Sequence, residues 1–294
     1  MPPFDITVDS ATCLIGAWIF AMGGSIGSFL NVAVYRLPGG MSLVQPGSHC
    51  PACKHAIRWF DNVPILGWLM LRGRCRDCGA GISARYPIVE GITASMFLLL
   101  GSYECLGGGV NLPVRSAESV RTVAELFGIY AYHLLLLCTL LAAGLMEFDG
   151  HRPWRSLFLP AILGGLIGPL IWPHLHPVPA GLPWLDGSGW ILGLTDGMAG
   201  LAAGLLLGWV ARLSVSPERK IDVLMCPACV GLFLGWQAVF VLLIGAMALD
   251  SGIKPLRTRF PAVRTLSPTV WLLSATIAWI VFWSQIVEAT QSLV

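Results

Sequence analysis

The stretch that decides the fold class begins with HCPACK at residues 49–54 and continues to RCRDCG at residues 74–79. It lies within a polar segment from Arg36 to Pro87, the one long polar interruption in an apolar sequence. Each CxxC pair forms a tight knuckle that places two thiolates on one side of a Zn²⁺ ion, and two knuckles complete a tetrahedron. Two residues within each pair and 21 between the pairs are typical of a zinc ribbon. The predicted ligands are Cys50, Cys53, Cys75 and Cys78.

Two disulfides, or four unrelated thiols, are the alternatives to a metal centre. Disulfides require an oxidising compartment, whereas the many cations of this loop favour a cytoplasmic location. We therefore expect a structural zinc site, because four thiolates leave no coordination position for a water molecule. Gly79, directly after the second pair, indicates a turn with positive φ. The cations are Arg36, Lys54, Arg58, Arg72, Arg74, Arg76 and Arg85.

Composition places the rest of the chain in a membrane. Of its 294 residues, 55% are hydrophobic and only 12% are charged, about half the usual charged share of a soluble domain. The mean hydropathy of +0.74 and several apolar runs near 20 residues predict an all-α polytopic membrane protein. The first apolar run follows no basic segment and no small-residue cleavage site, so it is predicted to be an anchor rather than a removable signal peptide.

About eight transmembrane helices are predicted, with both termini outside. A single span between Asp222 and Asp250 would export the cations that follow it, so we expect two short helices there, breaking near residues 235–237. With this topology 16 of the 18 Lys and Arg residues are cytoplasmic. The other predicted spans are 11–34, 87–106, 126–146, 157–172, 190–210 and 268–287. The predicted domains are a first transmembrane helix (1–35), a cytoplasmic cysteine-rich domain (36–87) and a transmembrane domain (88–294).

Several residues inside the predicted spans invite a structural interpretation. Small residues between Gly23 and Ser28 favour close helix packing, and Asn31 is expected to face the bundle or the loop because it is costly in lipid. We interpret Asp196 as a buried polar contact. The second CPAC, from Cys226 to Cys229, is either a redox or metal pair or two buried thiols, and its apolar helix favours buried thiols. A helix-packing face is predicted from Gly197, Gly200, Gly204 and Gly208.

A collinear series of motifs resembles the type IV prepilin peptidases. The series covers roughly residues 24–92, and residues 196–200 and 234–236 continue the resemblance more loosely. Its segments are GSFLNV (27–32) with YRLP (35–38), HCPAC (49–53), DNVPILGW (61–68), LRGRCRDCG (71–79) and ISARYPIVE (82–90).

The resemblance implies a function. Members of that family are bacterial inner-membrane aspartic endopeptidases that cleave the leader from type IV prepilins and type II secretion pseudopilins at the cytoplasmic face. Many also N-methylate the new N-terminus with S-adenosylmethionine, which is therefore an implied cofactor if methylation is retained. No Gly-x-Gly-x-x-Gly fingerprint is present, so this second activity rests on the resemblance alone. The implied partners are a prepilin or pseudopilin and membrane lipid, with no nucleic acid.

The family's two catalytic aspartates lie at the cytoplasmic ends of transmembrane helices, the second within a Gly-x-Gly-Asp motif. Asp149 closes the third predicted span and matches the first position, and Asp222 is the best match for the second. Two facing carboxylates that share one proton can act as base toward a water and as acid toward the scissile carbonyl. Their mutual repulsion splits the apparent pKa values of the pair.

Around Asp222 the sequence departs from the family pattern. Residues 219–222 read RKID, so both glycines are absent, and Leu224 stands where a lysine is usual. A glycine pair lets a substrate backbone approach the carboxylate closely, and Lys220 and Ile221 would obstruct it. The alternative hypothesis is therefore a catalytically inactive relative that serves as a membrane scaffold or assembly protein. A transporter is disfavoured, because only Asp196 approaches mid-membrane depth.

Overall fold

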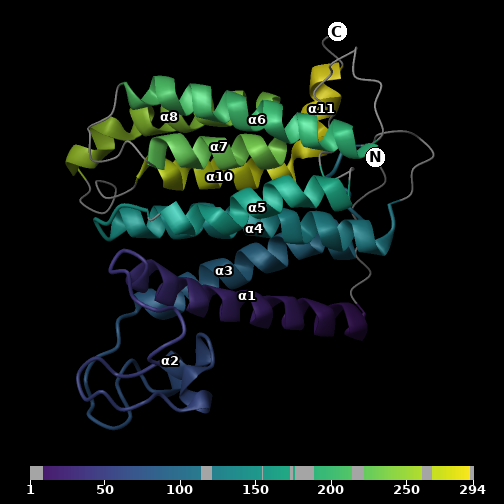
Figure 1. The fold of residues 1–294 in the computed structure, drawn as a ribbon. Coiled ribbons are helices and arrows are strands. Elements are labelled where there is room, and N and C mark those ends of the chain that lie inside the picture. Colours follow the sequence, from purple (N-terminus) through teal and green to yellow (C-terminus); the bar gives the residue numbers. More distant parts are fainter. Residues whose placement is uncertain are drawn as a thin grey trace. The chain divides into compact units, whose positions relative to one another are not determined.

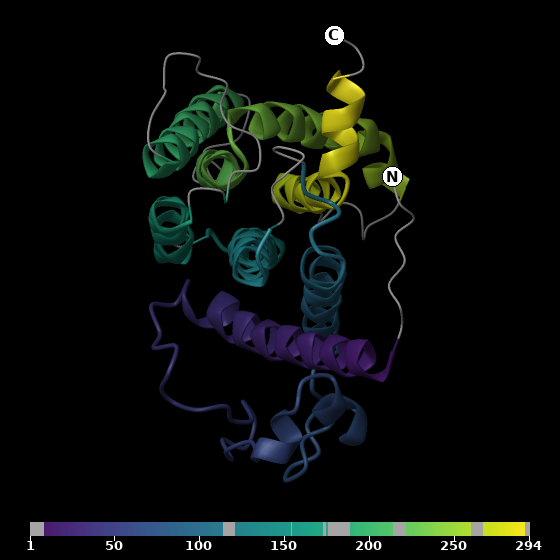
Figure 2. The ribbon, with the colours of Figure 1, turned by 90° about the vertical axis from the view of Figure 1, so that its right-hand side faces the viewer.

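The computed structural model describes residues 9–113, 121–153, 155–172, 175, 189–213, 222–259 and 267–291. Within these ranges the regular structure is helical, with two isolated β-bridges (Figures 1 and 2). The chain divides into two compact units, Met1–Ser102 and Tyr103–Val294. The predicted domain boundary at residue 35 and the one at residue 87 both fall inside the first unit.

Unit 1 is built on two long helices, α1 (Ser10–Arg36) and α3 (Arg85–Gly101). They meet through small residues of α1. A methyl group added at Gly23 would lie 2.7 Å from Phe97 Cβ, and one at Gly27 would lie 2.8 Å from the Cα of Glu90. Since real Cβ atoms do not approach so closely, the glycines permit the contact, and the predicted packing through small residues is confirmed.

The polypeptide between these helices contains only two short helical segments, η1 (Trp59–Asn62) and α2 (Leu66–Met70). Asn31 of α1 is 2% exposed, and its Nδ2 donates to the carbonyl of Tyr86 at 3.4 Å. The prediction that Asn31 turns away from lipid is therefore confirmed.

Unit 2 is a helical bundle centred on α7 (Asp222–Leu234), which packs against five other helices (Figure 2). The predicted break after it is present at Gly235, whose φ of +86° is accessible to glycine at little cost. The neighbours of α7 are α4 (Val123–Phe148), α5 (Arg155–Ile171), α6 (Gly189–Arg212), α8 (Trp236–Arg259) and α10 (Pro268–Val281).

The contact between α6 and α7 is made through backbone. A Cβ at Gly200 would overlap the carbonyl of Gly231, and one at Gly204 would overlap the carbonyl of Pro227. Gly197 and Gly208 lie on the same buried face of α6. The predicted glycine packing face is confirmed, and it explains why these two helices approach so closely.

The lengths and hydropathies of the helices identify a multi-pass membrane protein. Of the described helices, four are long and apolar enough to cross a membrane, and the bent pair α10 and α11 (Trp283–Gln291) makes a fifth. At the positions of the other three predicted spans the structure has shorter apolar helices, Arg155–Ile171, Leu224–Leu234 and Trp236–Gly252. The side chains of Lys254, Arg257, Arg259 and Arg264, which decided between seven and eight spans, lie outside the described residues, so the sidedness stays a prediction.

Asn111 inserts at the 74° bend between α10 and α11 and bonds to the helix backbone there. In an unbroken helix the N–H of Ser284 would donate to Ile280. Here it donates to the carbonyl of Asn111 at 2.9 Å, and the carbonyl of Ile280 accepts from Asn111 Nδ2 at 3.0 Å. Asn111 thus replaces one rung of the helix with two bonds of its own, which fixes the bend.

A buried pair of ionisable residues holds Asn111 in place. His133 Nδ1 lies 2.6 Å from Glu104 Oε1, and Asn111 Nδ2 also donates to Glu104 Oε1, at 3.3 Å. Glu104 and His133 are both 0% exposed. Glu104 belongs to a single π-helical turn, η2 (Ser102–Leu106). Buried ionisable groups in a membrane bundle are costly unless they bond to one another. We therefore interpret this cluster as a stabilising feature of unit 2.

Candidate metal centre and catalytic carboxylates

The two CxxC pairs form equivalent knuckles. In the first, the N–H of Cys50 donates to the carbonyl of His55 at 2.9 Å; in the second, the N–H of Cys75 donates to Ala80 at 2.8 Å. Each knuckle also closes a turn, from Lys54 N to Cys50 O and from Gly79 N to Cys75 O, both at 2.9 Å. The residue after each pair has positive φ, Gly79 at +71° as predicted and Lys54 at +62°.

The knuckles bring four sulfur atoms together. Cys50 Sγ lies 3.8 Å from Cys78 Sγ, Cys53 Sγ lies 4.0 Å from Cys75 Sγ, and all four sulfurs lie within 4.8 Å of one another. A tetrahedron with Zn–S bonds of about 2.3 Å has edges of about 3.8 Å. None of the nine cysteines forms a disulfide. The four thiols therefore form a cluster whose dimensions suit one tetrahedral metal ion.

The thiols of this cluster differ in acidity. Backbone N–H groups of Cys53 and Ala52 donate to Cys50 and lower its pKa to about 6. The Ala80 amide acts on Cys78 in the same sense, but desolvation and the neighbouring thiols outweigh it and raise the pKa of Cys78 to about 12. Four thiolates this close repel one another strongly, so full ionisation needs a cation among them. The donor set thus fits a divalent metal.

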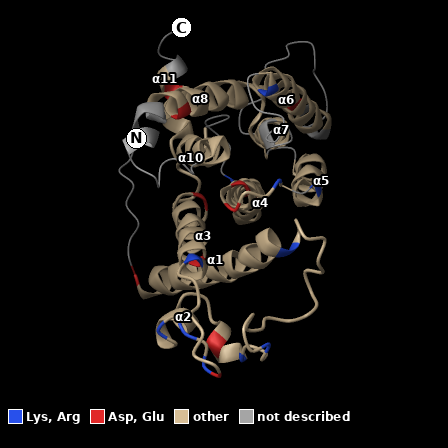
Figure 3. Cartoon of the chain, turned by 90° about the vertical axis from the view of Figure 1, so that its left-hand side faces the viewer, with Lys and Arg blue, Asp and Glu red and all other residues tan. Residues whose placement is uncertain are grey.

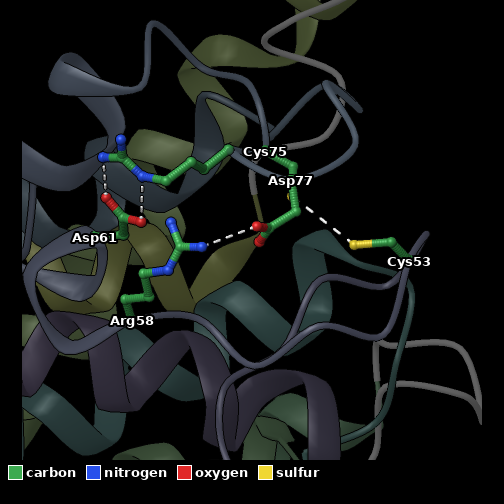
Figure 4. Close-up of polar contacts among 6 residues, drawn as sticks. Cys53, Arg58, Asp61, Cys75 and Asp77 are labelled. Carbon is green, nitrogen blue, oxygen red and sulfur yellow. Dashed lines mark hydrogen bonds and ion pairs between the residues drawn. The ribbon is translucent and has the colours of Figure 1, made fainter.

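Ion pairs tie the second knuckle to η1 (Figure 4). Arg76 donates to both carboxylate oxygens of Asp61, Nε to Oδ2 at 2.8 Å and Nη2 to Oδ1 at 2.6 Å. The Arg76 guanidinium lowers the pKa of Asp61 below its usual value. Arg58 Nη2 pairs with Asp77 at 3.1 Å. These contacts orient the segment between the knuckles and lie outside the predicted ligand set.

The first candidate catalytic residue caps the end of α4. The N–H of Asp149 donates to Leu145 at 3.0 Å, Gly150 follows with φ +75°, and His151 N donates to Met146 at 2.9 Å. This is a Schellman motif, which satisfies the last carbonyls of the helix and stops it at this point. Asp149 therefore stands at the end of α4, as the sequence predicts, and its side chain is half-buried.

The second candidate, Asp222, is the first residue of α7, but its side chain lies outside the described residues. The distance between the two predicted carboxylates is therefore not tested. Further contacts report on this region. Thr269, near the start of α10, donates to Glu147 Oε1 at 2.6 Å, and its Oγ1 lies 4.0 Å from Cys226 Sγ. Cys226 is one helical turn beyond Asp222, and Glu147 is two residues before Asp149, so the end of α4 and the start of α7 meet at α10.

Glu147 is a functional candidate that the sequence reasoning missed. It is a half-buried carboxylate in the last turn of α4 whose Oε1 bonds to Thr269. The signal available in the sequence is its position, two residues before Asp149.

The remaining polar and thiol residues that the sequence analysis singled out are buried. Asp196 is 2% exposed inside α6, which confirms a buried polar residue. Cys226 and Cys229 are each 1% exposed within α7, as expected for buried thiols. Among the described residues, only Cys50, Cys53, Cys75 and Cys78 form a group of three or more potential ligands close enough to hold a metal ion.

Comparison with known proteins identifies the family. The chain is 34% identical over 237 residues to a prepilin leader peptidase/N-methyltransferase of Klebsiella pneumoniae, covering 77% of this chain and 88% of that protein. It belongs to the prepilin leader peptidase family. Residues 21–103 match the family described as the Bacterial Peptidase A24 N-terminal domain, and this match lies almost entirely within unit 1.

Two more relatives share the name prepilin leader peptidase/N-methyltransferase. That of Aeromonas hydrophila is 31% identical over 255 residues, covering 77% of this chain and 75% of the relative. That of Myxococcus xanthus is 49% identical over 84 residues, which is 29% of this chain and 25% of the relative. No solved structure matches the chain. The prepilin peptidase resemblance of the motifs is thereby confirmed.

Proposed function

We propose that this protein is an aspartic endopeptidase of the bacterial inner membrane that removes the leader peptide from type IV prepilins or pseudopilins. Asp149 and Asp222 act as the catalytic pair, and both lie on the cytoplasmic side together with the cysteine-rich loop. The observation that carries the proposal is the likeness to named prepilin leader peptidases over most of the chain. The meeting of α4, α7 and α10 at Thr269 supports it, because this contact draws the two candidate helix ends together.

The proposed chemistry needs one proton shared between two carboxylates. The ionised carboxylate accepts a proton from a water molecule, which attacks the scissile carbonyl of the leader. The protonated carboxylate donates to the carbonyl oxygen as negative charge develops there. Cleavage next to the membrane suits a substrate whose apolar helix stays in the bilayer while its polar leader enters the aqueous face.

Zinc is proposed as the resident metal, held by Cys50, Cys53, Cys75 and Cys78. Four thiolate ligands fill a tetrahedral shell, so zinc would stabilise the loop and would not act as a Lewis acid toward a substrate. The second activity in the relatives' names would require S-adenosylmethionine, and we propose it for this chain on the strength of those names alone.

Glu147 is an alternative to Asp149 as the catalytic carboxylate of α4. Its Oε1 bonds to the threonine that also contacts α7, so it is linked through Thr269 to the helix that carries Asp222. Glu147 is therefore the alternative to Asp149 as the partner of Asp222, and substitution distinguishes the two.

The test is co-expression with a pilin precursor from the same genome, with leader removal read by mass. Asp222→Asn and the correct α4 variant, Asp149→Asn or Glu147→Gln, should each lower cleavage by about 10²–10⁴-fold, since one carboxylate cannot be base and acid at once. Asp196→Asn is the matched control and should cleave normally. Normal cleavage by Asp222→Asn would remove it from the mechanism.

The alternative function is a catalytically inactive membrane scaffold or assembly protein. The sequence RKID at residues 219–222, without the glycines of the family motif, favours it. If the unsubstituted protein leaves every pilin-like precursor of its genome uncleaved but still binds one, this alternative replaces the peptidase.

A further inference from the structure

The short helix α2 exposes one apolar face. Leu66, Leu69 and Met70 are 56%, 55% and 70% exposed, and their spacing of three and four residues places them on the same side of the helix. The opposite side is held in place: Gly67 is buried, and Trp68 Nε1 donates to the carbonyl of Ile82 at 3.0 Å. Three large apolar side chains are thus fixed outward by a well-anchored backbone.

The segment leading into α2 lies beside a membrane span. A methyl group added at Gly24 of α1 would lie 3.3 Å from Pro64 Cβ. Gly24 is twelve residues before Arg36, where α1 ends, which is about 18 Å along the helix axis. The 27 residues of α1 are about 40 Å long, which exceeds the roughly 30 Å of the hydrocarbon core, so the helix extends beyond the core. Pro64 therefore lies beside α1 itself, short of the helix end at Arg36.

The backbone N–H groups of Ile65 and Leu66 are both hydrogen-bonded, as a position beside lipid requires. Leu66 N bonds to Pro64 O at 2.6 Å around Ile65, whose φ of 63° and ψ of −55° form a γ-turn of the rare positive-φ type. The N–H of Ile65 donates to Glu90 Oε2 at 2.7 Å. Glu90 is a 6% exposed carboxylate of the apolar helix α3. Irregular backbone persists beside lipid only where its polar groups find partners, and Glu90 is that partner.

Positive charge follows the apolar face directly. Arg72 and Arg74 are exposed, and neither takes part in an ion pair within the part of the chain that the structure describes. Arg58 and Arg76, by contrast, are paired with Asp77 and Asp61. Figure 3 shows the Lys and Arg residues gathered around α2, while the helices of unit 1 are largely uncharged along their length. An apolar face flanked by unneutralised arginines is the pattern of an interfacial membrane helix.

We propose that α2 docks onto the lipid bilayer beside α1 and α3. Leu66, Leu69 and Met70 enter the boundary between headgroups and acyl chains, and Arg72 and Arg74 bind the phosphates of acidic phospholipids. This contact holds the four-cysteine cluster against the membrane. The proposal concerns lipid alone and does not depend on peptidase activity.

The experiment uses the full-length protein in nanodiscs of phosphatidylglycerol. A photo-reactive phenylalanine analogue replaces Met70 in one variant and Leu69 in another, and adducts are identified by mass after irradiation. Val44 is the matched control, because it is 81% exposed in the same loop but precedes the first knuckle. We expect lipid adducts at both α2 positions and at least about fivefold fewer at Val44. Zinc content shows that each variant is folded.

A second measurement tests the arginines. The pair Arg72→Glu and Arg74→Glu, added to the Met70 variant, should lower the lipid adduct severalfold in phosphatidylglycerol and leave the yield in phosphatidylcholine unchanged. Adducts at Met70 and Leu69 to another part of this chain, to a second copy or to an added pilin precursor, in place of lipid, overturn the proposal. Equal lipid yields at Val44 and Met70 overturn it as well.

Discussion

The cysteine-rich loop of unit 1 and the bundle of unit 2 hold their candidate sites by different means. All four thiols come from a stretch of 29 residues, Cys50 to Cys78, positioned by hydrogen bonds within each knuckle. The candidate carboxylates of unit 2 are supplied by α4 and α7, which are far apart in sequence and meet through Thr269 of α10. A site built locally is specified by spacing, whereas a site built from distant helices depends on packing.

The two regions also differ in what stabilises them. Between residues 37 and 84 only Cys50 and Gly67 are buried, so the loop has almost no apolar core of its own. In unit 2, by contrast, large side chains such as Leu136, Phe158 and Phe233 are 0% exposed. A region too small to bury a core relies on metal or covalent links, and a bundle relies on packing. Removing the metal should therefore affect only the first region.

The largest expected effect is the loss of the metal. Purified protein should contain close to one zinc per chain, and the double substitution Cys50→Ser with Cys75→Ser should abolish it. Binding of structural zinc contributes an apparent 10–16 kcal/mol, roughly, to such small domains. The loop should then become protease-sensitive while far-UV circular dichroism changes little.

The control for this experiment is Cys226→Ser with Cys229→Ser, which should keep the zinc because both thiols lie within α7. Wild-type protein without zinc, purified under reducing conditions, would show that the four-thiol cluster is not a zinc site.

The next effect concerns the buried pair of unit 2. Glu104→Leu removes the acceptor shared by His133 and Asn111 and leaves their donors buried without it. Breaking a buried pair on one side costs about 3–5 kcal/mol, so we expect a clear loss of thermal stability in detergent. Glu104→Gln keeps an acceptor oxygen and should lose less. Equal stability of the Leu variant and wild type would mean that the pair contributes nothing to the bend at α11.

A smaller effect is expected where α6 and α7 touch. Gly200→Ala forces a Cβ against the carbonyl of Gly231, and overpacking of this kind costs about 1–3 kcal/mol. Gly245→Ala on α8 is the matched control, because no atom lies within 4 Å of its added Cβ. A lower unfolding temperature for the first variant alone supports the close contact. If both variants match wild type, the helices are further apart than the glycines indicate.

The smallest effect is expected from the ion pair of Asp61 with Arg76. Because Arg76 lowers the pKa of Asp61, the pair contributes at neutral pH and loses its contribution only as pH falls below about 4. A double-mutant cycle at pH 7 with Asp61→Asn and Arg76→Gln, read as the rate of zinc release to a chelator, should show faster release in each single variant. Release rates that simply multiply in the double variant would exclude a direct coupling.

Features that depend on neighbours in sequence were predicted well. The knuckles follow from two CxxC pairs and a following turn residue, and the helix break follows from Gly235, whose positive φ other residues resist. The apolar spans follow from length and hydropathy, since a helix in lipid must satisfy its own backbone. The glycines of α6 indicated a packing face but could not name its partner.

By itself, the sequence determined that this is a multi-pass helical membrane protein with a four-thiol loop, because backbone satisfaction in lipid and metal-ligand spacing are local properties. Only the tertiary structure decided that Asn111 bends α10 into α11, that Glu90 holds Ile65 beside α1, and that Glu147 bonds to Thr269. Each of these contacts joins residues separated by at least 25 positions. Such partners are set by which helices pack together and at what depth, and no spacing rule along the chain encodes that.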